Sequence, residues 1–249
     1  MFGALVDELE KWSDTGKVAE FWWRDDDAQK PSVQLERLLA ISDRHRAAVS
    51  LATIPHGVQV PLAEVLSGHD QVSILQHGFS HRNYAPETER KMELGWHRPG
   101  EQIMGQIQSG QSDLKGLFGE QLVPVLVPPW NRIDLRVAER LEKCGLRGLS
   151  TLGPRKQSFA VEGLKQVNVH VDIMNWKQGR CFAGEHHCIE QIIAHLGAKR
   201  AGLVDPDEPT GIMSHHLVHD AGCWTFLDEL FGFLVSQSSA CLISARKIF

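Results

Sequence analysis

Two histidines and three consecutive carboxylates are the side chains of this sequence best suited to do chemistry together. His77 and His81 stand four residues apart in the stretch HGFSH, and Asp25, Asp26 and Asp27 form an acidic triplet farther upstream. Two imidazoles and one carboxylate make half of the ligand shell of a divalent transition metal, for which Zn²⁺ fits best and Co²⁺, Ni²⁺ and Fe²⁺ are alternatives. An incomplete shell leaves positions for water and substrate, as a hydrolytic metal centre requires.

Each of these signals also has a simpler interpretation. Adjacent carboxylates repel one another, and an exposed, solvated acidic turn relieves that repulsion as well as a cation does. The chain has 13 histidines, so pairs four residues apart arise by chance, and His215 with His219 is another such pair. Gly78 follows His77, which excludes the HEXXH helix of zinc proteases.

Further polar side chains follow apolar runs later in the chain. Trp130 and Asn131 come directly after the segment VPP, a rigid corner that would hold the Trp ring and its backbone N–H in one orientation. Asp172 precedes Trp176 by four residues, and His215 ends another apolar run. Taken singly, these residues are also explained as a proline-rich turn, a helix cap and an ordinary core or surface histidine.

The elements that must position these residues alternate along the chain between short apolar runs and longer amphipathic ones. The apolar runs predict strands over residues 19–24, 48–54, 71–76, 122–127, 146–151, 166–172, 210–215 and 240–245. The amphipathic runs predict helices over residues 33–45, 99–117, 134–144, 187–200 and 224–236. The chemically interesting residues all fall at the carboxyl ends of predicted strands.

This alternation predicts an α/β fold, either a parallel barrel or a doubly wound sheet. Barrel enzymes collect their catalytic residues at the carboxyl ends of several strands, so the positions of the polar residues favour a barrel with one mouth. An open sheet with its site at a switch point is the alternative. No linker or low-complexity segment divides residues 1–249, which predicts a single domain.

The composition excludes several classes of protein. With 42% hydrophobic residues, a net charge of −5 and no basic run, the chain has no feature of a nucleic-acid-binding protein. An acidic N-terminal segment and the absence of a long apolar stretch predict a cytoplasmic protein with neither signal peptide nor membrane span. Walker A, GxGxxG and GxSxG motifs are absent, which removes NTPases, dinucleotide-binding enzymes and serine hydrolases in their usual forms.

The order of the polar segments resembles that of the polysaccharide deacetylase family, the NodB-homology or carbohydrate esterase 4 group. An acidic strand end, HxxxH, a Pro-Pro-aromatic corner, Asp-x-x-x-Trp and an apolar-x-His segment follow one another over roughly residues 19 to 216. The resemblance implies a distorted (β/α) barrel of about seven strands. It also implies a metal-dependent hydrolase that removes acetyl groups from N-acetylated, or O-acetylated, sugars.

Carried over to this sequence, the resemblance implies a role for each candidate residue. The catalytic residues would be Asp25 as general base and His215 as general acid, with Asp172 orienting the acid. The metal ligands would be Asp26, His77 and His81. The residues that contact substrate would be Trp130 and Trp176, which wall the groove, the Trp130 backbone N–H, and Asn131.

Two departures from the family pattern leave alternatives open. Val127 stands where the family usually carries an arginine that pairs with the base, and Arg24, Asn131 or Arg132 are the available substitutes. Asp27 stands where the family usually has glycine. The alternatives are a sugar-binding protein without catalytic activity and a barrel metallohydrolase that cleaves another linear or cyclic amide. The expected partner is a small saccharide, nucleotide sugar or lipid-linked precursor; the sequence does not determine the oligomeric state.

Overall fold

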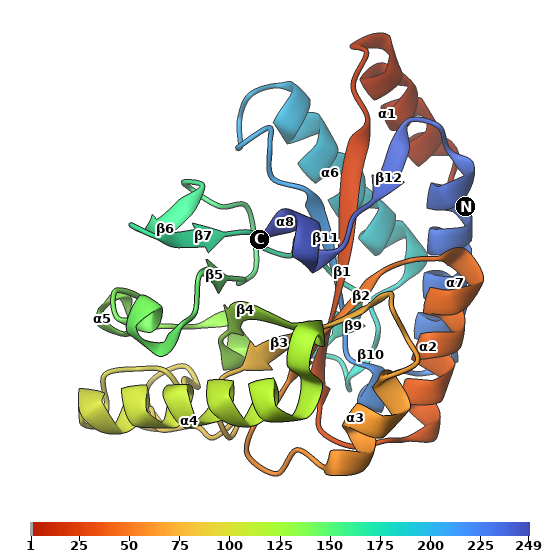
Figure 1. Ribbon diagram of the computed structural model, residues 1–249. Helices are drawn as coiled ribbons and strands as arrows, with labels where there is room; N and C mark the ends of the chain where they lie inside the picture. Colours follow the sequence, from red (N-terminus) through yellow and green to blue (C-terminus); the bar gives the residue numbers. More distant parts are fainter. Residues whose placement is uncertain (1) are drawn as a thin grey trace.

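The computed structural model describes residues 2–249 and contains one large, mostly parallel sheet (Figure 1). Its strands run in the order β6-β7-β5-β4-β3-β2-β1-β11-β8, and β12 pairs with the start of β1. The parallel strands are β1 (Ala19–Ala28), β2 (Val49–Thr53), β3 (Val72–His77), β4 (Leu122–Val127), β5 (Gly148–Leu149), β8 (Val171–Asp172), β11 (Thr210–Ser214) and β12 (Ala240–Leu242). Strands β6 (Phe159–Val161) and β7 (Leu164–Gln166) form a hairpin at one edge, and β9 (Met174–Asn175) pairs with β10 (Cys181–Phe182) separately.

The sheet closes on itself through residues just outside the named strands. Leu152, after β5, bridges to Val169, before β8, in parallel register. The Val169 N–H donates to the Thr151 carbonyl over 3.0 Å, and the Gly153 N–H donates to the Val169 carbonyl over 2.8 Å. The ring therefore contains β1, β2, β3, β4, β5, β8 and β11, which confirms the predicted distorted barrel of about seven strands.

Helices cover the outside of this ring (Figure 1). They are α1 (Gly3–Asp14), α2 (Val33–His45), α3 (Val60–Leu66), α4 (Gly100–Phe118), α5 (Leu135–Ala138), α6 (Glu185–Arg200), α7 (Ala221–Ser236) and α8 (Ala245–Ile248). The predicted helix over 134–144 is divided into α5 and the 3₁₀ turn η3 (Leu141–Cys144), and the predicted strand over 240–245 ends at Leu242. None of the helices within residues 2–249 combines the length and apolar character needed to cross a membrane.

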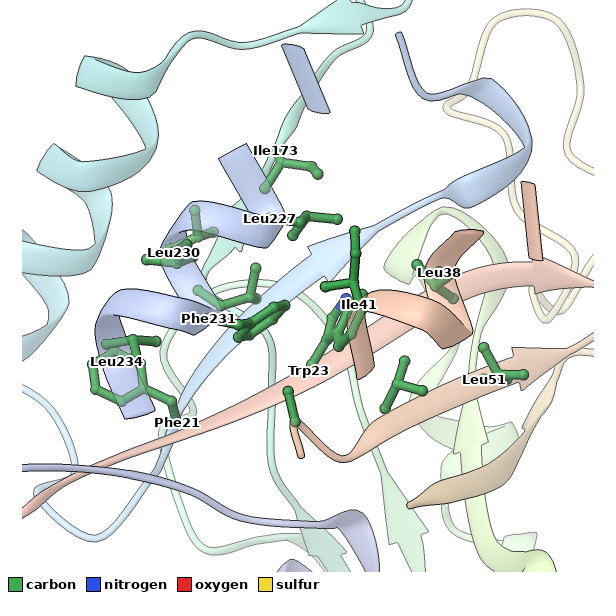
Figure 2. Packing of buried hydrophobic residues seen from close by; sticks show 14 of the residues in the cluster. Phe21, Trp23, Leu38, Ile41, Leu51, Ile173, Leu227, Leu230, Phe231 and Leu234 are labelled. Atoms are coloured by element: carbon green, nitrogen blue, oxygen red, sulfur yellow. The ribbon is translucent and has the colours of Figure 1, made fainter. Parts of the chain in front are cut away.

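The two faces of β1 serve two different layers of the core. Phe21 and Trp23 point outward, and Trp23 packs against Phe231 of α7 with ring centroids 4.5 Å apart (Figure 2). Trp22 and Arg24 alternate with them and point into the ring, as successive side chains of a strand do. Figure 2 shows the outer layer, in which α2 and α7 pack over the strands through Leu38, Ile41, Leu227, Leu230, Phe231 and Leu234.

The amino-terminal end of the ring is filled by apolar side chains. Ile248 of α8 lies in the same buried cluster as Trp22, and the ring of Phe249 meets Trp22 edge-on at 6.1 Å. The Trp22 indole N–H is satisfied by the Asn168 carbonyl at 3.0 Å. With this end plugged, the polar side chains of the inner face concentrate at the opposite end, where the strands finish.

Candidate active site

A cavity of about 740 Å³ lies at the carboxyl ends of the strands. Its volume is within the range of small-molecule sites, roughly 300–1,000 Å³. The cavity is lined by Asp26, Asp27, His77, His81, Lys91, Trp130, Asn131, Arg132, Leu152, Asp172, Trp176, Arg180, Met213, His215 and Val218. Every site residue predicted from the sequence is in this set except Asp25.

Asp27, rather than Asp26, lies with the two histidines of HGFSH. Its Oδ1 is 3.2 Å from His77 Nε2 and 3.4 Å from His81 Nε2. Ligands held about 2.0–2.1 Å from a tetrahedral Zn²⁺ lie roughly 3.3–3.4 Å from one another. The two distances from Asp27 therefore match those between ligands of one Zn²⁺, and the ligand atoms of Asp27, His77 and His81 all lie within 4.8 Å of one another.

An irregularity in β1 brings Asp27 to this position. Regular alternation would point Asp27 to the same side as Asp25, away from the cavity. Instead Asp27 has a φ of 76°, and the pairing of β1 with β2 shifts register between Asp26 and Ala28. This bulge turns the Asp27 side chain into the cavity next to Asp26, which is why two neighbouring residues of one strand line the same site.

The buried carboxylate of Glu93 shapes the loop that carries His81. Its Oε1 accepts hydrogen bonds from the Ser80 N–H at 2.7 Å and the Ser80 hydroxyl at 2.9 Å, and its Oε2 accepts from the N–H groups of Phe79 and His81, both at 3.2 Å. Gly78, at φ 54°, has no room for a side chain, because a Cβ would stand 2.1 Å from Glu93 Oε2. Glu93 is thus a positioning residue that the sequence analysis missed, and nothing in its local sequence marks it.

The hydrogen bond on the far side of His77 determines which ring nitrogen faces Asp27. His77 Nδ1 donates to the Val127 carbonyl at 2.9 Å, so in the neutral ring Nε2 carries a lone pair toward Asp27. Within residues 2–249 the buried Asp27 Oδ1 accepts no hydrogen bond, although His77 Nε2 lies 3.2 Å away. Two lone-pair atoms that face each other in a buried site repel unless a metal ion or a proton lies between them, so the residues present fit a divalent metal.

The pKa shifts of the metal-free chain reflect the same arrangement. Burial alone would lower the pKa of His77, but contact with Asp27 and the charges of Asp26 and Asp27 raise it overall. Burial and the neighbouring charge of His77 lower the pKa of His81. Burial alone would raise the pKa of Asp27, and the contact and charge of His77 lower it instead. A proton on His77 thus takes the place of the cation when no metal is bound.

Asp26 is held beside the three residues by a buried arginine from its own strand. Arg24 donates from Nε to Asp26 Oδ1 at 2.8 Å and from Nη2 to Oδ2 at 3.0 Å, and its Nη1 is anchored on the Ser150 hydroxyl at 2.8 Å. Arg24 Nη2 also donates to Asn131 Oδ1 at 2.7 Å. Of the three substitutes considered for the arginine missing at Val127, Arg24 pairs with a cavity carboxylate, Asn131 supports it, and Arg132 instead donates to the Lys91 carbonyl.

Asp25 does not reach the cavity. Its fully buried carboxylate accepts from the Ser214 hydroxyl at 2.6 Å and the His216 N–H at 2.9 Å, and it forms a close hydrogen bond with His216 Nδ1. Although burial would raise the pKa of Asp25, the charge and hydrogen bond of His216 lower it. Asp25, which the resemblance implied as the general base, is therefore buried outside the cavity, where it holds the turn after β11 in place.

His215 enters the cavity from that turn. Its Nε2 lies 4.0 Å from Asp26 Oδ2, and its Nδ1 has no hydrogen-bond partner. Asp172, expected to orient it, accepts instead from the Met174 N–H at 3.0 Å and the Trp176 indole N–H at 2.7 Å. The ring of Trp176 in turn meets His215 edge-on, with ring centroids 4.6 Å apart. Asp172 therefore contacts Trp176, and Trp176 contacts His215. Burial raises the pKa of Asp172.

The Pro-Pro-aromatic corner forms another part of the wall. Trp130 and Asn131 both have a φ of 57°, which turns the chain sharply after Pro129. The ring of Trp130 packs edge-on against His81 at 4.5 Å, while Trp176 stands 43% exposed on another wall. The two indoles and Asn131 thus line the same cavity as the two histidines of HGFSH.

A second cluster of metal-type ligands lies at the opposite, amino-terminal end of β11. His170, His195 and Glu208 have ligand atoms within 4.8 Å of one another. The Gly211 N–H donates to His170 Nδ1 at 2.9 Å, and His170 Nε2 lies 3.2 Å from Glu208 Oε2. No recognised spacing marks these three residues in the sequence.

Comparison with known proteins identifies the fold. No family model matches the sequence, and no curated protein matches it either. Among solved structures, a protein from Mycobacterium smegmatis assigned as a polysaccharide deacetylase is similar at a TM-score of 0.69 and 16% identity, over 94% of this chain and 89% of that one. A family 4 acetyl xylan esterase from Clostridium thermocellum, solved with a cobalt ion, is similar at 0.56 and 14% identity, over 92% and 90% of the two chains.

The peptidoglycan deacetylase PdaC from Bacillus subtilis is similar at a TM-score of 0.59 and 12% identity, over 93% of this chain and 90% of that one. At these identities the similarity concerns the fold. The chain has the NodB-like fold of the carbohydrate deacetylases and esterases along nearly its whole length, as its motif order predicted.

Proposed function

We propose that this protein is a metal-dependent hydrolase that removes an acetyl group from an N-acetylated sugar. The observation that carries the proposal is the buried Asp27 Oδ1, which has no hydrogen-bond donor among residues 2–249 and lies 3.2 and 3.4 Å from the Nε2 atoms of His77 and His81. The shared fold with deacetylases of polysaccharides and peptidoglycan supports the substrate class. The cobalt ion of the acetyl xylan esterase supports a transition metal, and histidine with carboxylate ligands favours Zn²⁺.

In this proposal the roles within the acidic triplet move by one residue from the sequence expectation. Asp27, His77 and His81 hold the metal, and Asp26 is the general base. When bound, the metal polarises the acetyl carbonyl and lowers the pKa of a water. Asp26 accepts a proton from the attacking water while Arg24 holds both of its oxygens in place.

His215 is the general acid of the proposed reaction. Its ring faces the cavity on the same side as Asp26, so it can donate a proton to the sugar nitrogen as the C–N bond breaks, which gives acetate and the free amine. Asp172 and Trp176 hold the ring edge-on in that position. The backbone N–H of Trp130 is the proposed donor to the developing oxyanion, and the indoles of Trp130 and Trp176 flank the sugar.

The position of Arg24 weakens the alternative of a sugar-binding protein without catalytic activity. The strongest support for that alternative was the missing arginine at Val127, which would have left the base without its partner. Arg24 supplies a guanidinium to Asp26 from β1 instead, and Asn131 holds the same guanidinium. A site that keeps base, guanidinium and acid together favours turnover.

A pair of conservative substitutions tests the proposed roles. The purified protein is loaded with Zn²⁺ or Co²⁺, and acetate release from N-acetylated chito-oligosaccharides is measured together with bound metal. Asp26→Asn should retain one equivalent of metal and lose activity by about a hundredfold or more, the loss expected without a general base. Asp25→Asn should keep metal and most of its activity once its lower stability is allowed for.

The reverse result would restore the assignment made from the sequence. An Asp26→Asn protein without metal, together with an inactive but metal-loaded Asp25→Asn protein, would mean that Asp25 is the base and Asp26 the ligand. A wild-type protein that holds stoichiometric metal but releases no acetate from any acetylated sugar would support the alternative of a silent binding protein.

A further inference from the structure

The mouth of the cavity carries three cations that the proposed reaction does not use. Lys91, Arg132 and Arg180 line the cavity together with the candidate catalytic residues. They come from three separate segments, which are the loop between β3 and α4, the turn after η2 (Pro129–Asn131), and the loop between β9 and β10. Their convergence is a product of the tertiary structure, because no basic run exists in the sequence.

These three cations have no carboxylate partner within 4.0 Å in the part of the chain that the structure describes, residues 2–249. Some arginines do, such as Arg155 with Asp205 and Arg200 with Glu8, whereas several other exposed arginines do not, so what sets these three cations apart is that they line one cavity. Of the cavity carboxylates, Asp26 is paired with Arg24, Asp172 accepts from the Trp176 indole, and Asp27 lies against His77 and His81.

The cavity is polarised, because Asp26 is buried at its floor, whereas Lys91 and Arg180 are exposed at its mouth and Arg132 is half-buried. Arg132 Nη1 is held by the Lys91 carbonyl at 2.8 Å, which joins two of the three segments. Burial and the neighbouring charge of Arg90 lower the pKa of the Arg132 guanidinium, as expected where cations crowd together. The chain as a whole has a net charge of −5, yet here three cations lie together without counter-ions. This arrangement favours an anionic ligand at the mouth of the cavity.

We propose that the mouth formed by Lys91, Arg132 and Arg180 binds an anionic group on the substrate, so that the acetylated sugar carries a phosphate or a carboxylate. This inference rests on the proposed function for the position of the acetyl group at the floor of the cavity. Guanidinium and ammonium groups are the side chains that bind phosphate and carboxylate oxygens. A neutral polymer would leave the three charges unpaired beside the substrate.

The test compares three substrates that share the acetamido group. N-acetylglucosamine is neutral, N-acetylglucosamine 1-phosphate adds a phosphate, and N-acetylmuramic acid adds a carboxylate. Acetate release by the metal-loaded protein should give a kcat/KM for one of the anionic substrates at least about tenfold above that for the neutral one, since hydrogen bonds to charged groups are among the stronger ones. The substrate that shows the higher kcat/KM identifies whether the mouth binds a phosphate or a carboxylate.

A triple variant and a matched control test whether the three cations of the mouth cause the higher kcat/KM for the anionic substrate. Lys91→Gln, Arg132→Gln and Arg180→Gln combined should bring the ratio of the anionic to the neutral kcat/KM close to one. The control combines Lys17→Gln, Lys143→Gln and Arg147→Gln, which removes the same charge from exposed positions outside the cavity and should leave the ratio unchanged. Raising the salt from about 0.05 M to about 0.5 M should reduce the ratio in the wild type and not in the triple variant.

Binding separates a failure of this inference from a failure of the proposed function. Calorimetric titration with N-acetylglucosamine 1-phosphate and with N-acetylmuramic acid should show affinity in the wild type that the triple variant loses, whether or not acetate is released. Loss of binding in the triple variant without any hydrolysis would overturn the deacetylase and keep the anion site. Equal binding and equal kcat/KM for neutral and anionic sugars would overturn the anion site and keep the deacetylase.

Discussion

Two clusters of histidine and carboxylate side chains lie at opposite ends of β11, and only one has the hydrogen bonds of a metal centre. At the carboxyl end, His77 Nδ1 donates to a carbonyl, which leaves Nε2 with a lone pair toward Asp27. At the amino end, His170 Nδ1 accepts from the Gly211 N–H, so in the neutral ring Nε2 must carry the hydrogen that points at Glu208. A ring nitrogen that carries a hydrogen cannot bind a metal.

The carboxylates differ in the same way. Glu208 accepts from the N–H groups of Arg155 and Asn168, both at 2.8 Å, in addition to its contact with His170, so its lone pairs are already in use. Asp27 Oδ1 accepts nothing. Residue types and spacings alone therefore do not distinguish a metal site from a buried polar network, whereas the hydrogen bonds behind each ring do.

The largest expected effect is on metal content. Asp27→Ala should lose more than about a hundredfold in affinity for Zn²⁺, since loss of a ligand exceeds the 10–100-fold typical of an outer hydrogen-bond partner. Glu208→Ala should keep one equivalent of metal in whatever fraction of the protein is folded. Elemental analysis of both variants after gel filtration makes the measurement, and metal lost from Glu208→Ala alone would reverse the comparison between the two clusters.

The free energy of unfolding should depend more on Glu208 than on Asp27, the opposite of what is expected for metal content. Glu208→Gln leaves buried N–H groups of Arg155 and Asn168 competing for one acceptor, and the free energy of unfolding should fall by about 2–3 kcal/mol. Asp27→Asn in the metal-free protein should cost less, about 1 kcal/mol, because Asp27 loses only its charge contact with His77, whereas Glu208 holds two buried backbone N–H groups. Urea denaturation in the presence of a chelator compares the two, and equal losses would show that both clusters are structural.

The pH dependence of metal binding follows from the two histidine ligands. The pKa of His77 is raised above the ordinary value of 6.5 and that of His81 is lowered below it. Protons therefore compete with metal first at His77, so affinity for Zn²⁺ should fall about tenfold per pH unit once the pH drops below the raised pKa. It should fall more steeply when His81 also becomes protonated. Competition titrations with a chelator across the pH range measure the slope, and an affinity independent of pH would exclude histidine ligation.

The smallest effect is expected at His195. Burial and the charge of His170 lower the pKa of His195 to about 2, so the ring is neutral, and its Nε2 has no hydrogen-bond partner. Its one polar contact is with the Thr210 hydroxyl at 3.0 Å. His195→Leu should cost less than about 1.5 kcal/mol, the net contribution of one hydrogen bond, and should leave metal content unchanged. A larger loss in thermal denaturation would give His195 a role that its contacts do not explain.

Much of the fold followed from the sequence because its elements are strongly patterned. The predicted strand over 122–127 and the predicted helix over 33–45 match β4 and α2 at both ends. The predictions over 146–151 and 166–172 found the right segments, but β5 and β8 have only two paired residues each. The barrel closes between them through a few irregular hydrogen bonds, which an apolar run cannot reveal.

For the candidate site, the sequence indicated the histidines but not the contacts of the aspartates and of Arg24. The sequence marked His77, His81 and His215, and all three line the cavity. The roles within the acidic triplet were implied by the family resemblance, and the bulge at Asp27 brings a different aspartate beside the histidines. Arg24 was one of three candidates to replace the missing arginine, and only the fold shows that it is the one that pairs with a cavity carboxylate.

The sequence by itself determined which residue types stand at the carboxyl ends of the strands and in what order, and a parallel α/β barrel then brings them to one mouth. The tertiary structure decided which aspartate faces the histidines, which nitrogen of each ring is free, and that Lys91, Arg132 and Arg180 converge on the same cavity. The reason is physical. Strand ends follow from local patterns of hydrophobicity, but side-chain direction and protonation are fixed by backbone groups of other strands, whose proximity exists only after folding.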